Sequence, residues 1–315
     1  MRSILSKRLL DLSPEDKQRF VDSFDYVLTD CDGVVWNTYG PTEGAGDAIS
    51  ELKGCGKHLV YVSNNSVRSL ENYQEQVRNL GHEVAEEDVI TPVFSVVKYL
   101  KSIEFQGLIY GIGSVEFLKV LQDAGYEVIS GPNEPMPEMI RLIAPVIYDK
   151  KPVKAVIIDF DYNCNNIKLL RAQMYLKGNP DCMLIAGPTD YTVAVSTGFQ
   201  ILGPGYYVDI LEKSTGRKAT ILGKPGHLLG EMLKKQYHIK DSRRGLFVGD
   251  MIAQDVAVGK VAGFQTLLVL TGGAKLSDVE QLKDGDAIPD YYTESFADLG
   301  QVVKEVQSFK NKSNL

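Results

Sequence analysis

The chain has 315 residues, of which 44% are hydrophobic and 24% charged, and its formal net charge is −7 at pH 7. This length favours about two domains, and the composition is that of an ordinary globular protein. The negative charge argues against a surface for nucleic acid or for anionic membranes. No apolar run approaches the roughly 18 residues that a membrane helix needs. The N-terminal residues carry charges where a secretory signal would need an apolar core.

The cysteines give a further indication of the compartment. Cys31, Cys55, Cys164 and Cys182 form no CxxC pair, and no histidine lies near them at the spacing of a zinc site. A disulfide framework is not expected in a chain of this length. Reduced cysteines are the simplest interpretation, and they predict a cytoplasmic protein.

Short apolar runs alternate with amphipathic segments along the chain. Ser13, followed by Pro14 and two acids, predicts the start of a first helix. Strands are predicted over residues 26–30, 58–65, 107–113, 126–130, 154–163, 182–187, 218–223, 245–250 and 265–273. Helices are predicted at about 47–53, 66–80, 91–102, 114–125, 166–178, 206–216 and 227–237, and again after residue 250. Such alternation is typical of an α/β fold with a doubly wound parallel sheet.

The alternation restarts near residue 103, and residues 188–205 form a stretch rich in small and polar side chains, which predicts a loop. The strand at 218–223 is expected to resume the first alternation. The simplest partition is an outer α/β domain of residues 1–102 and 215–315, interrupted by an inserted α/β module of residues 103–214.

Polar residues follow four of the strands predicted for the outer domain. They are Asp30, Asp32 and Gly33, then Ser63, Asn64 and Asn65, then Lys224, and last Asp250 and Asp255. Ligands of doubly wound sheets bind outside the carboxyl ends of the strands, so we expect these residues to meet. Clustered aspartates need a cation, and oxygen ligands with a phosphate suit Mg²⁺. Ser63 and the backbone N–H groups around Asn64 would bind phosphate oxygens, with added charge from Lys224.

Each of these residues also has a simpler interpretation. The aspartates after the first strand could cap a loop, Ser63 could be a turn residue, and Asp250 and Asp255 could be acids at a helix N-terminus. Lys224 does not fit a P-loop, because six residues separate the preceding glycines and a proline follows. The catalytic interpretation is favoured because all four groups of residues occur at the ends of predicted strands.

Two further features of the sequence need an interpretation beside this site. A second DxD pair, Asp159 and Asp161, follows a strand of the insert but lacks the glycine that follows Asp32. We therefore expect no direct catalytic role for it. Trp36 and Tyr39 come just after the first aspartates, and they either flank an aromatic substrate or pack in the interior.

The segments "DCDGVVW", "VSNNS", "TGRKATILGKPG" and "VGDMIAQDVAVGKVAGFQTLLVLTGG" occur in this order. Together they resemble the haloacid dehalogenase (HAD) superfamily of phosphatases, in its branch of 4-nitrophenylphosphatases, phosphoglycolate phosphatases and pyridoxal phosphatases. The resemblance covers about residues 24 to 300. It implies a Rossmann-like core, a C2-type cap formed by the insert, hydrolysis of small phosphomonoesters and a homodimer that forms through the cap.

The resemblance also implies a role for each matching residue. Asp30 would be the nucleophile that forms an aspartyl phosphate, and Asp32 would protonate the leaving group and then activate water. Mg²⁺ would be bound by the Asp30 carboxylate, the Asp32 carbonyl and Asp250, with Asp255 supporting the metal. Ser63 and Asn64 would bind phosphate, and Asn65 would shape their loop. Gly33 would allow the ligand to approach closely, and Lys224 would balance the charge.

The sequence leaves the substrate and two rival functions open. Pyridoxal phosphatases of this branch carry a histidine in the loop at 188–205, which has none here, so selectivity for pyridoxal phosphate is not expected. The same loop has no basic residue, so its charge does not favour phosphoglycolate. One rival is phosphotransfer between substrates by the same residues. The other is a non-catalytic phosphate-binding protein, against which the intact pair Asp30 and Asp32 argues.

Overall fold

The computed structural model describes residues 6–196 and 199–313. The chain divides into two compact units. The first is drawn from Met1–Ser63, Leu70–Ile90 and His227–Leu315, and the second from Asn64–Ser69 and Thr91–Gly226. The chain therefore passes from one unit to the other several times, and each unit is described separately.

The first unit is built on a seven-stranded sheet whose strands are all parallel. The strands lie in the order β1 (Lys7–Arg8), β16 (Tyr291–Thr293), β15 (Gln265–Val269), β14 (Gly245–Gly249), β2 (Tyr26–Thr29), β5 (His58–Val62) and β6 (Val89–Ile90). From the central pair β14 and β2, chain order runs outward through β15 and β16 on one side and through β5 and β6 on the other, with β1 added at the edge beside β16. This pair is the switch point at which such sheets bind ligands, and the predicted doubly wound α/β fold is confirmed.

Helices cover the sheet of this unit. They are α1 (Pro14–Asp22), α2 (Ala45–Gly54), α3 (Leu70–Asn79), α9 (His227–Gln236), α10 (Ala257–Ala262), α11 (Leu276–Gln281) and α12 (Phe296–Ser313). A small hairpin of β3 (Trp36–Asn37) and β4 (Gly40–Pro41) follows β2. The predicted start of α1 is confirmed, because the side chain of Ser13 accepts a hydrogen bond from the backbone N–H of Asp16 at 3.1 Å.

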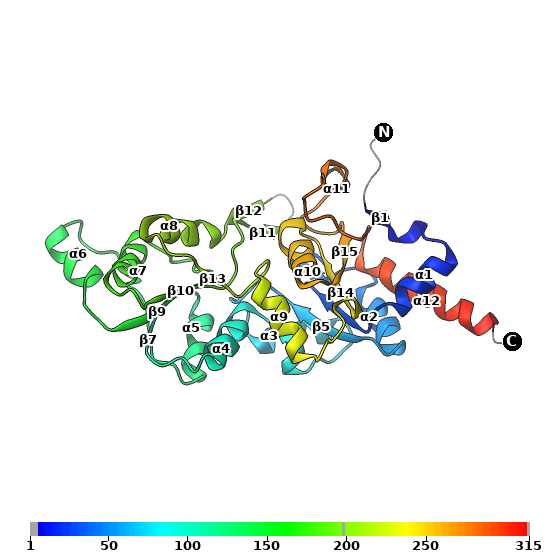
Figure 1. Cartoon of the computed structure of the whole chain (residues 1–315), viewed down its shortest axis with the longest axis horizontal. Helices are drawn as coiled ribbons and strands as arrows, with labels where there is room; N and C mark the ends of the chain where they lie inside the picture. Colours follow the sequence, from blue (N-terminus) through cyan, green and yellow to red (C-terminus); the bar gives the residue numbers. More distant parts are fainter. Residues whose placement is uncertain (1–5, 197–198, 314–315) are drawn as a thin grey trace. The chain divides into compact units, whose positions relative to one another are not determined.

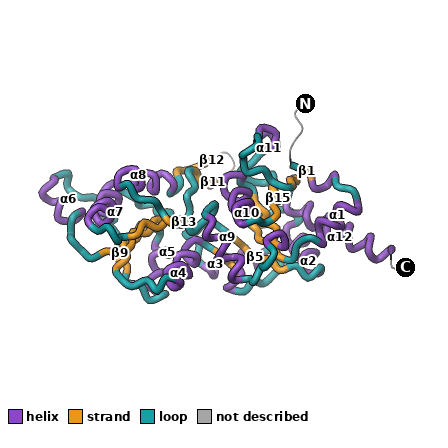
Figure 2. The backbone as a smooth tube through the Cα atoms, in the orientation of Figure 1, coloured by secondary structure: helices purple, strands orange, loops and turns teal. Residues whose placement is uncertain are grey.

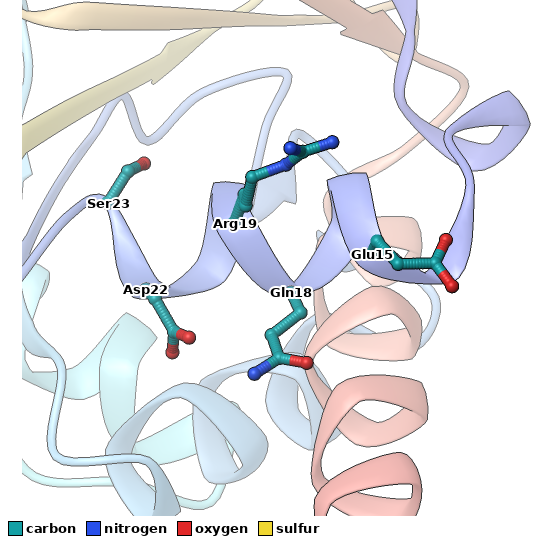
Figure 3. Close-up of a pocket in the computed structure, with 5 residues that line it drawn as sticks. All are labelled: Glu15, Gln18, Arg19, Asp22 and Ser23. Atoms are coloured by element: carbon teal, nitrogen blue, oxygen red, sulfur yellow. The ribbon is translucent and has the colours of Figure 1, made fainter.

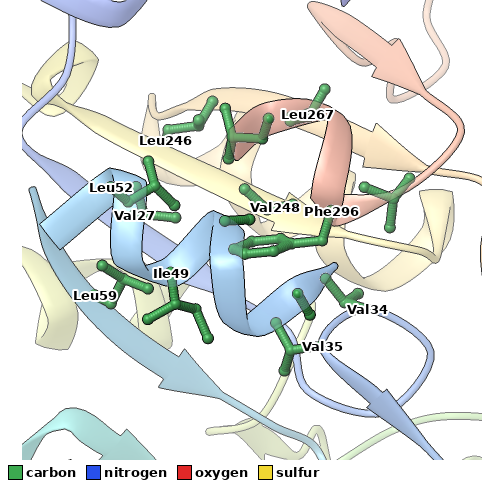
Figure 4. Packing of buried hydrophobic residues seen from close by; sticks show 14 of the residues in the cluster. Val27, Val34, Val35, Ile49, Leu52, Leu59, Leu246, Val248, Leu267 and Phe296 are labelled. Atoms are coloured by element: carbon green, nitrogen blue, oxygen red, sulfur yellow. The ribbon is translucent and has the colours of Figure 1, made fainter. Parts of the chain in front are cut away.

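Both faces of the sheet are buried, because successive strand residues point to opposite sides. Val27 belongs to the core that contains Ile49, Leu52 and Phe296, which Figure 4 shows around the ring of Phe296. Its neighbour Leu28 belongs to a second core, with residues of α9 and α10. Burial of one such aliphatic side chain contributes about 1.5–3 kcal/mol, so the two cores fix the position of β2 and of the loop that follows it.

The second unit contains a five-stranded parallel sheet in the order β13 (Thr220–Ile221), β10 (Met183–Ala186), β9 (Val153–Ile158), β7 (Leu108–Ile112) and β8 (Val128–Ile129). Its helices are α4 (Pro92–Ser102), α5 (Val115–Asp123), α6 (Ile140–Ile147), α7 (Asn166–Gly178) and α8 (Gly205–Thr215). Figure 2 shows these helices in purple and the strands in orange. The unit is a second α/β module with its own core.

Three sequence-based expectations differ from the structure. The stretch at 188–205 is not all loop, because β11 (Thr192–Ser196) and β12 (Phe199–Leu202) form an antiparallel hairpin. Helix α6 was not predicted. The strand at 218–223 was expected in the outer domain, but β13 pairs with β10 in the second unit, and the backbone N–H of Leu222 donates to the carbonyl of Ala186 at 2.9 Å. An apolar run predicts a strand, but it does not determine the partner of that strand.

Within the described residues, no helix combines the length and the apolar character that crossing a bilayer requires. The four cysteines are all free thiols, as the sequence predicted.

Candidate active site

The first aspartates lie on a tight turn directly after β2. The backbone N–H of Asp30 donates to the carbonyl of Val248 at 2.8 Å, which ties the end of β2 to β14. The turn is closed by the N–H of Gly33, which donates to the carbonyl of Trp36 at 2.7 Å. Gly33 has a φ of 88°, a conformation that favours glycine. The turn therefore presents Asp30 and Asp32 at the carboxyl edge of the sheet, beside the switch point.

The side chain of Trp36 orients Asp32. Its Nε1 donates to Asp32 Oδ1 at 3.2 Å, and its ring stacks on Tyr61 with centroids 6.2 Å apart. Trp36 is 1% exposed, so the structure supports interior packing for this residue, whereas Tyr39 is 83% exposed. Cys31, between the two aspartates, is buried in the core on one face of the sheet. The sequence did not predict the hydrogen bond that links Trp36 to Asp32.

Asp250 follows β14 and is surrounded by glycines. Its Oδ2 accepts a hydrogen bond from the N–H of Gly273 at 2.6 Å. A Cβ at Gly272 would lie 1.9 Å from this Oδ2, and a Cβ at Gly33 would lie 2.7 Å from it. Both distances are shorter than real Cβ contacts, so the Asp250 carboxylate can keep this position only if residues 33 and 272 are glycine. The glycines of the "DG" and "TGG" motifs thus shape the space around Asp250.

Asp255 organises the backbone that carries Asp250. It lies in a π-helical turn, Ile252–Val256, a type of turn frequently found at functional sites. Its Oδ2 accepts hydrogen bonds from the N–H groups of Asp250 at 3.1 Å and Met251 at 2.9 Å. A carboxylate used in this way fixes the turn after β14, which agrees with the supporting role that the resemblance implies.

The carboxylates of Asp30, Asp250 and Asp255 converge. Each offers an oxygen within 4.8 Å of the oxygens of the other two, and all three residues are buried. Two unit charges at this distance repel each other by about 3 kcal/mol at an effective dielectric constant of 20. Three buried carboxylates therefore favour a bound cation, and an all-oxygen set suits a hard divalent metal. The side chain of Asp32 is not a member of this group.

Ser63 follows β5 and is held in place by an aromatic residue. It is 4% exposed, its N–H donates to the carbonyl of Ile90 at 2.9 Å, and the hydroxyl of Tyr73 donates to its Oγ at 2.8 Å. The sequence did not predict the contact of Tyr73 with Ser63. A signal existed, because Tyr73 and Val77 lie four residues apart on the buried face of the amphipathic helix α3.

Asn64, Asn65 and Lys224 belong to the second unit. Asn64 Oδ1 accepts from the N–H of Lys224 at 2.8 Å, and its Nδ2 donates to the carbonyl of Lys224 at 3.1 Å and to Asp190 Oδ2 at 2.7 Å. The side chain of Asn64 thus ties two loops together. Asn65 Oδ1 accepts from the N–H of Val67 at 2.9 Å, which shapes the loop.

The second DxD pair is built differently. Asp161 Oδ2 and Lys168 Nζ form a buried ion pair at 2.6 Å, with side-chain exposures of 4% and 2%. A carboxylate paired in this way contributes to the interior of the second unit. This arrangement agrees with the expectation that the pair has no direct catalytic role.

A pocket on the first unit lies elsewhere. It is lined by Glu15, Gln18, Arg19, Asp22 and Ser23, and Figure 3 shows these side chains on α1. Helix α1 leads directly into the N-terminal end of β2, so this pocket lies toward the amino edge of the sheet. The acidic residues described above lie at the carboxyl edge.

Comparisons with known proteins agree with this arrangement. The family model described as haloacid dehalogenase-like hydrolase matches residues 27–127, and the one described as HAD-hydrolase-like matches residues 221–299. A glycerol-3-phosphate phosphatase of Gallus gallus is 32% identical over 305 residues, which are 93% of this chain and 96% of that protein. The chloroplastic phosphoglycolate phosphatase 1A of Arabidopsis thaliana is 31% identical over 90% of this chain and 79% of its own.

A solved structure has the same fold. The p-nitrophenyl phosphatase from Archaeoglobus fulgidus superimposes with a TM-score of 0.74 at 25% identity, over 89% of this chain and 99% of that one. The similarity therefore extends over most of this chain and nearly all of the other.

Proposed function

The chain belongs to the haloacid dehalogenase-like hydrolases, and on that premise we propose that it is a Mg²⁺-dependent phosphatase that hydrolyses small phosphomonoesters through an aspartyl phosphate on Asp30. Its relatives are phosphoric monoester hydrolases, so the general class of reaction follows from the family. The observation that carries the proposal is the buried group of Asp30, Asp250 and Asp255 at the switch point of the sheet.

The residues present fit a divalent metal. Three buried carboxylates converge, and the glycines at 33 and 272 leave space beside Asp250 Oδ2 that a Cβ would fill. We assign the metal to the carboxylates of Asp30 and Asp250 and to the backbone carbonyl of Asp32, with Asp255 holding the turn behind them. Bound there, Mg²⁺ would neutralise the charge that develops on the phosphoryl oxygens.

The reaction then has two steps. A carboxylate oxygen of Asp30 attacks phosphorus, the bond from phosphorus to the ester oxygen breaks, and Asp32 gives its proton to the leaving alkoxide. In the second step Asp32 takes a proton from water, and the resulting hydroxide attacks the aspartyl phosphate, so that phosphate leaves and Asp30 is restored. The hydrogen bond from Trp36 Nε1 to Asp32 Oδ1 would orient the carboxyl group for this proton transfer.

We assign phosphate binding to Ser63 Oγ and to the backbone N–H of Asn64, with Asn65 shaping the loop and Lys224 supplying positive charge. Support comes from chain connectivity, because Ser63 and Asn64 are consecutive and Asn64 hydrogen-bonds both backbone polar groups of Lys224. Lys224 is 2% exposed, and a buried ammonium is stabilised by anionic neighbours, of which a bound phosphoryl group would be one.

We further propose that the leaving group is uncharged and hydroxylated, as in a polyol phosphate. Asp190 belongs to the loop that follows β10, and Asn64 Nδ2 holds its carboxylate at 2.7 Å. Residues 188–205 contain no Lys, Arg or His, so a second anionic group on the substrate would find no basic side chain in this loop. We expect kcat/KM for glycerol 3-phosphate to exceed that for phosphoglycolate, and the reverse order would refute this assignment.

We propose that the inserted module, predicted at 103–214, acts as the C2-type cap and carries a homodimer interface. Size-exclusion chromatography with light scattering tests the dimer, and a monomer at micromolar concentration would refute it. We also retain the prediction of a cytoplasmic location and the expectation that neither nucleic acid nor membrane is a partner.

The central test is Asp30→Asn with 4-nitrophenyl phosphate as substrate. The amide is not a nucleophile, so hydrolysis should disappear while the circular dichroism spectrum stays that of the wild type. Asp161→Asn in the second DxD pair is the matched control for mechanism, and any folded variant of it should retain hydrolysis. Activity in Asp30→Asn near the wild-type level would refute the aspartyl phosphate.

A further inference from the structure

Asp159, the first residue of the second DxD pair, is a buried carboxyl group that the proposed mechanism does not use. It follows β9 directly, is 0% exposed, and its N–H donates to the carbonyl of Ile112 at 2.8 Å. Its Oδ1 accepts from the N–H of Phe160 at 2.6 Å, while its Oδ2 has no hydrogen-bond partner among the described residues. A buried carboxyl oxygen without a partner is costly, which points to a specific reason for an acid here.

The carboxyl group packs against two segments from other parts of the chain. A Cβ at Gly187, the residue after β10, would lie 2.2 Å from Asp159 Oδ2 and 3.1 Å from the Cβ of Pro92, at the start of α4. The hydroxyl of Ser66 acts on the same carboxyl group, and it also lacks a hydrogen-bond partner of ordinary geometry. The carbonyl of Ser66 is held by Ser114 Oγ at 3.2 Å. The Asp159 carboxyl group and the Ser66 hydroxyl are therefore neighbours in this buried space.

The backbone segments of Ser66 and Gly187 are both connected to the proposed phosphate-binding residues. Ser66 lies two residues after Asn64 on the same short connector. The carbonyl of Gly187 accepts from the N–H of Gly223 at 3.0 Å, and Gly223 precedes Lys224. The hydrogen bonds of Asn64 to the backbone of Lys224 close this arrangement. A change in charge or volume at Asp159 therefore acts directly on the backbone that carries both residues.

The surroundings of Asp159 favour its neutral form. Burial, with a smaller contribution from the negative charge of Asp190, raises the pKa of Asp159 to about 8, although the N–H of Phe160 and the hydroxyl of Ser66 act in the opposite direction. Asp161, on the same loop, is neutralised by Lys168. The basic residues on the segments that carry Ser66, Pro92 and Gly223 are Arg68, Lys98, Lys101 and Lys224. The carboxyl group therefore keeps its proton at neutral pH and loses it in mildly alkaline solution.

We propose that Asp159 is a positioning residue whose uncharged carboxyl group holds the backbone of Asn64 and Lys224 in the geometry that binds phosphate, and that its ionisation disturbs this geometry. The inference rests on the proposed function for the role of Asn64 and Lys224. A negative charge in this closed space would pull the Ser66 hydroxyl toward itself and repel Asp190, whose carboxylate Asn64 holds. Weaker phosphate binding is the expected consequence.

The test compares wild type with Asp159→Asn, which keeps the shape of the side chain and cannot ionise. With 4-nitrophenyl phosphate and saturating Mg²⁺, we expect wild-type kcat/KM to fall about tenfold per pH unit above a midpoint near pH 8, through a rise in KM. Asp159→Asn should lack this alkaline limb while matching the wild type at pH 6.5. An identical limb in both proteins would overturn the proposal.

A second variant keeps the proposal testable if Asp159→Asn does not fold. Ser66→Ala removes the hydroxyl that lowers the pKa of Asp159, so the alkaline midpoint should move to higher pH. A midpoint that is unchanged or lower would count against Asp159 as the titrating group.

A measurement without turnover separates this inference from the proposed function. The Kd of inorganic phosphate for wild type and Asp159→Asn, by calorimetry with Mg²⁺ present, should diverge above pH 8, with weaker binding in the wild type only. Absence of phosphatase activity alongside this divergence would remove the proposed function and keep the inference. Phosphate affinities with the same pH dependence in both proteins would overturn the inference even in an active enzyme.

Discussion

Gly272→Ala tests whether the glycines around Asp250 determine metal binding. A Cβ at this position would lie 1.9 Å from Asp250 Oδ2, and real Cβ atoms essentially never come closer than 3.0 Å, so the carboxylate must retreat by about 1 Å. A displacement of this size in a catalytic group can reduce rate about 100-fold. That factor corresponds to about 3 kcal/mol in the transition state, without the loss of any ligand.

The assay is kcat/KM for 4-nitrophenyl phosphate as a function of Mg²⁺ concentration, together with Mg²⁺ affinity by calorimetry. We expect Gly272→Ala to need a higher Mg²⁺ concentration and to fall about 100-fold in kcat/KM at the wild-type optimum. The matched control is Gly54→Ala at the end of α2, where a Cβ meets no atom within 4 Å. Wild-type Mg²⁺ affinity and kcat/KM in a folded Gly272→Ala protein would refute the argument.

Three further predictions concern the same edge of the sheet. Tyr73→Phe removes the hydroxyl that donates to Ser63 Oγ at 2.8 Å, so the free energy of unfolding should fall by about 1 kcal/mol and KM should rise; urea denaturation and steady-state kinetics check this. Trp36→Phe removes the donor to Asp32 Oδ1, so kcat should fall about tenfold with little change in KM, and an unchanged kcat would contradict the orienting role. Chelation by EDTA should abolish activity, and added Mg²⁺ should restore it; activity indifferent to EDTA, or not restored by Mg²⁺, would exclude the metal assignment.

Much of the first unit could be predicted from local sequence. The apolar run before Asp30 and the capped start at Ser13 lie where β2 and α1 form, because both signals depend on neighbouring residues alone. The convergence of Asp30 with Asp250 and Asp255 was also predictable, because strands of a parallel sheet end at one edge. These features need no knowledge of distant contacts.

The features that sequence did not predict depend on distant partners. Thr220 and Ile221 form a strand, but they pair with Ile185 and Ala186 because the hydrogen bonds offered by the end of β10 are available there. A run of apolar residues carries no information about which sheet it joins. The hydrogen bond from Tyr73 to Ser63 could not be predicted for the same reason, because an aromatic residue on a buried helix face does not indicate which group its hydroxyl contacts.

Helix α6 was not predicted for a different reason, which is a proline within it. Pro145 lies inside it, and proline in a helix interior is usually a sign against helix. An eight-residue helix has few backbone bonds to lose, so packing against α7 can outweigh the proline. No element was predicted for these residues, because local propensity gives little sign of a helix that contains proline and contacts α7.

The π-helical turn at Ile252–Val256 makes the length of this segment as important as its residues. A π turn holds one more residue than an α turn, and each residue of an α-helix rotates the next side chain by about 100°. Deletion of a single residue that converted this turn to regular helix would swing the carboxylate of Asp255 away from the N–H groups of Asp250 and Met251, although every acidic residue would still be present. Relatives of this chain that vary in sequence here are thus expected to keep the spacing between the two aspartates.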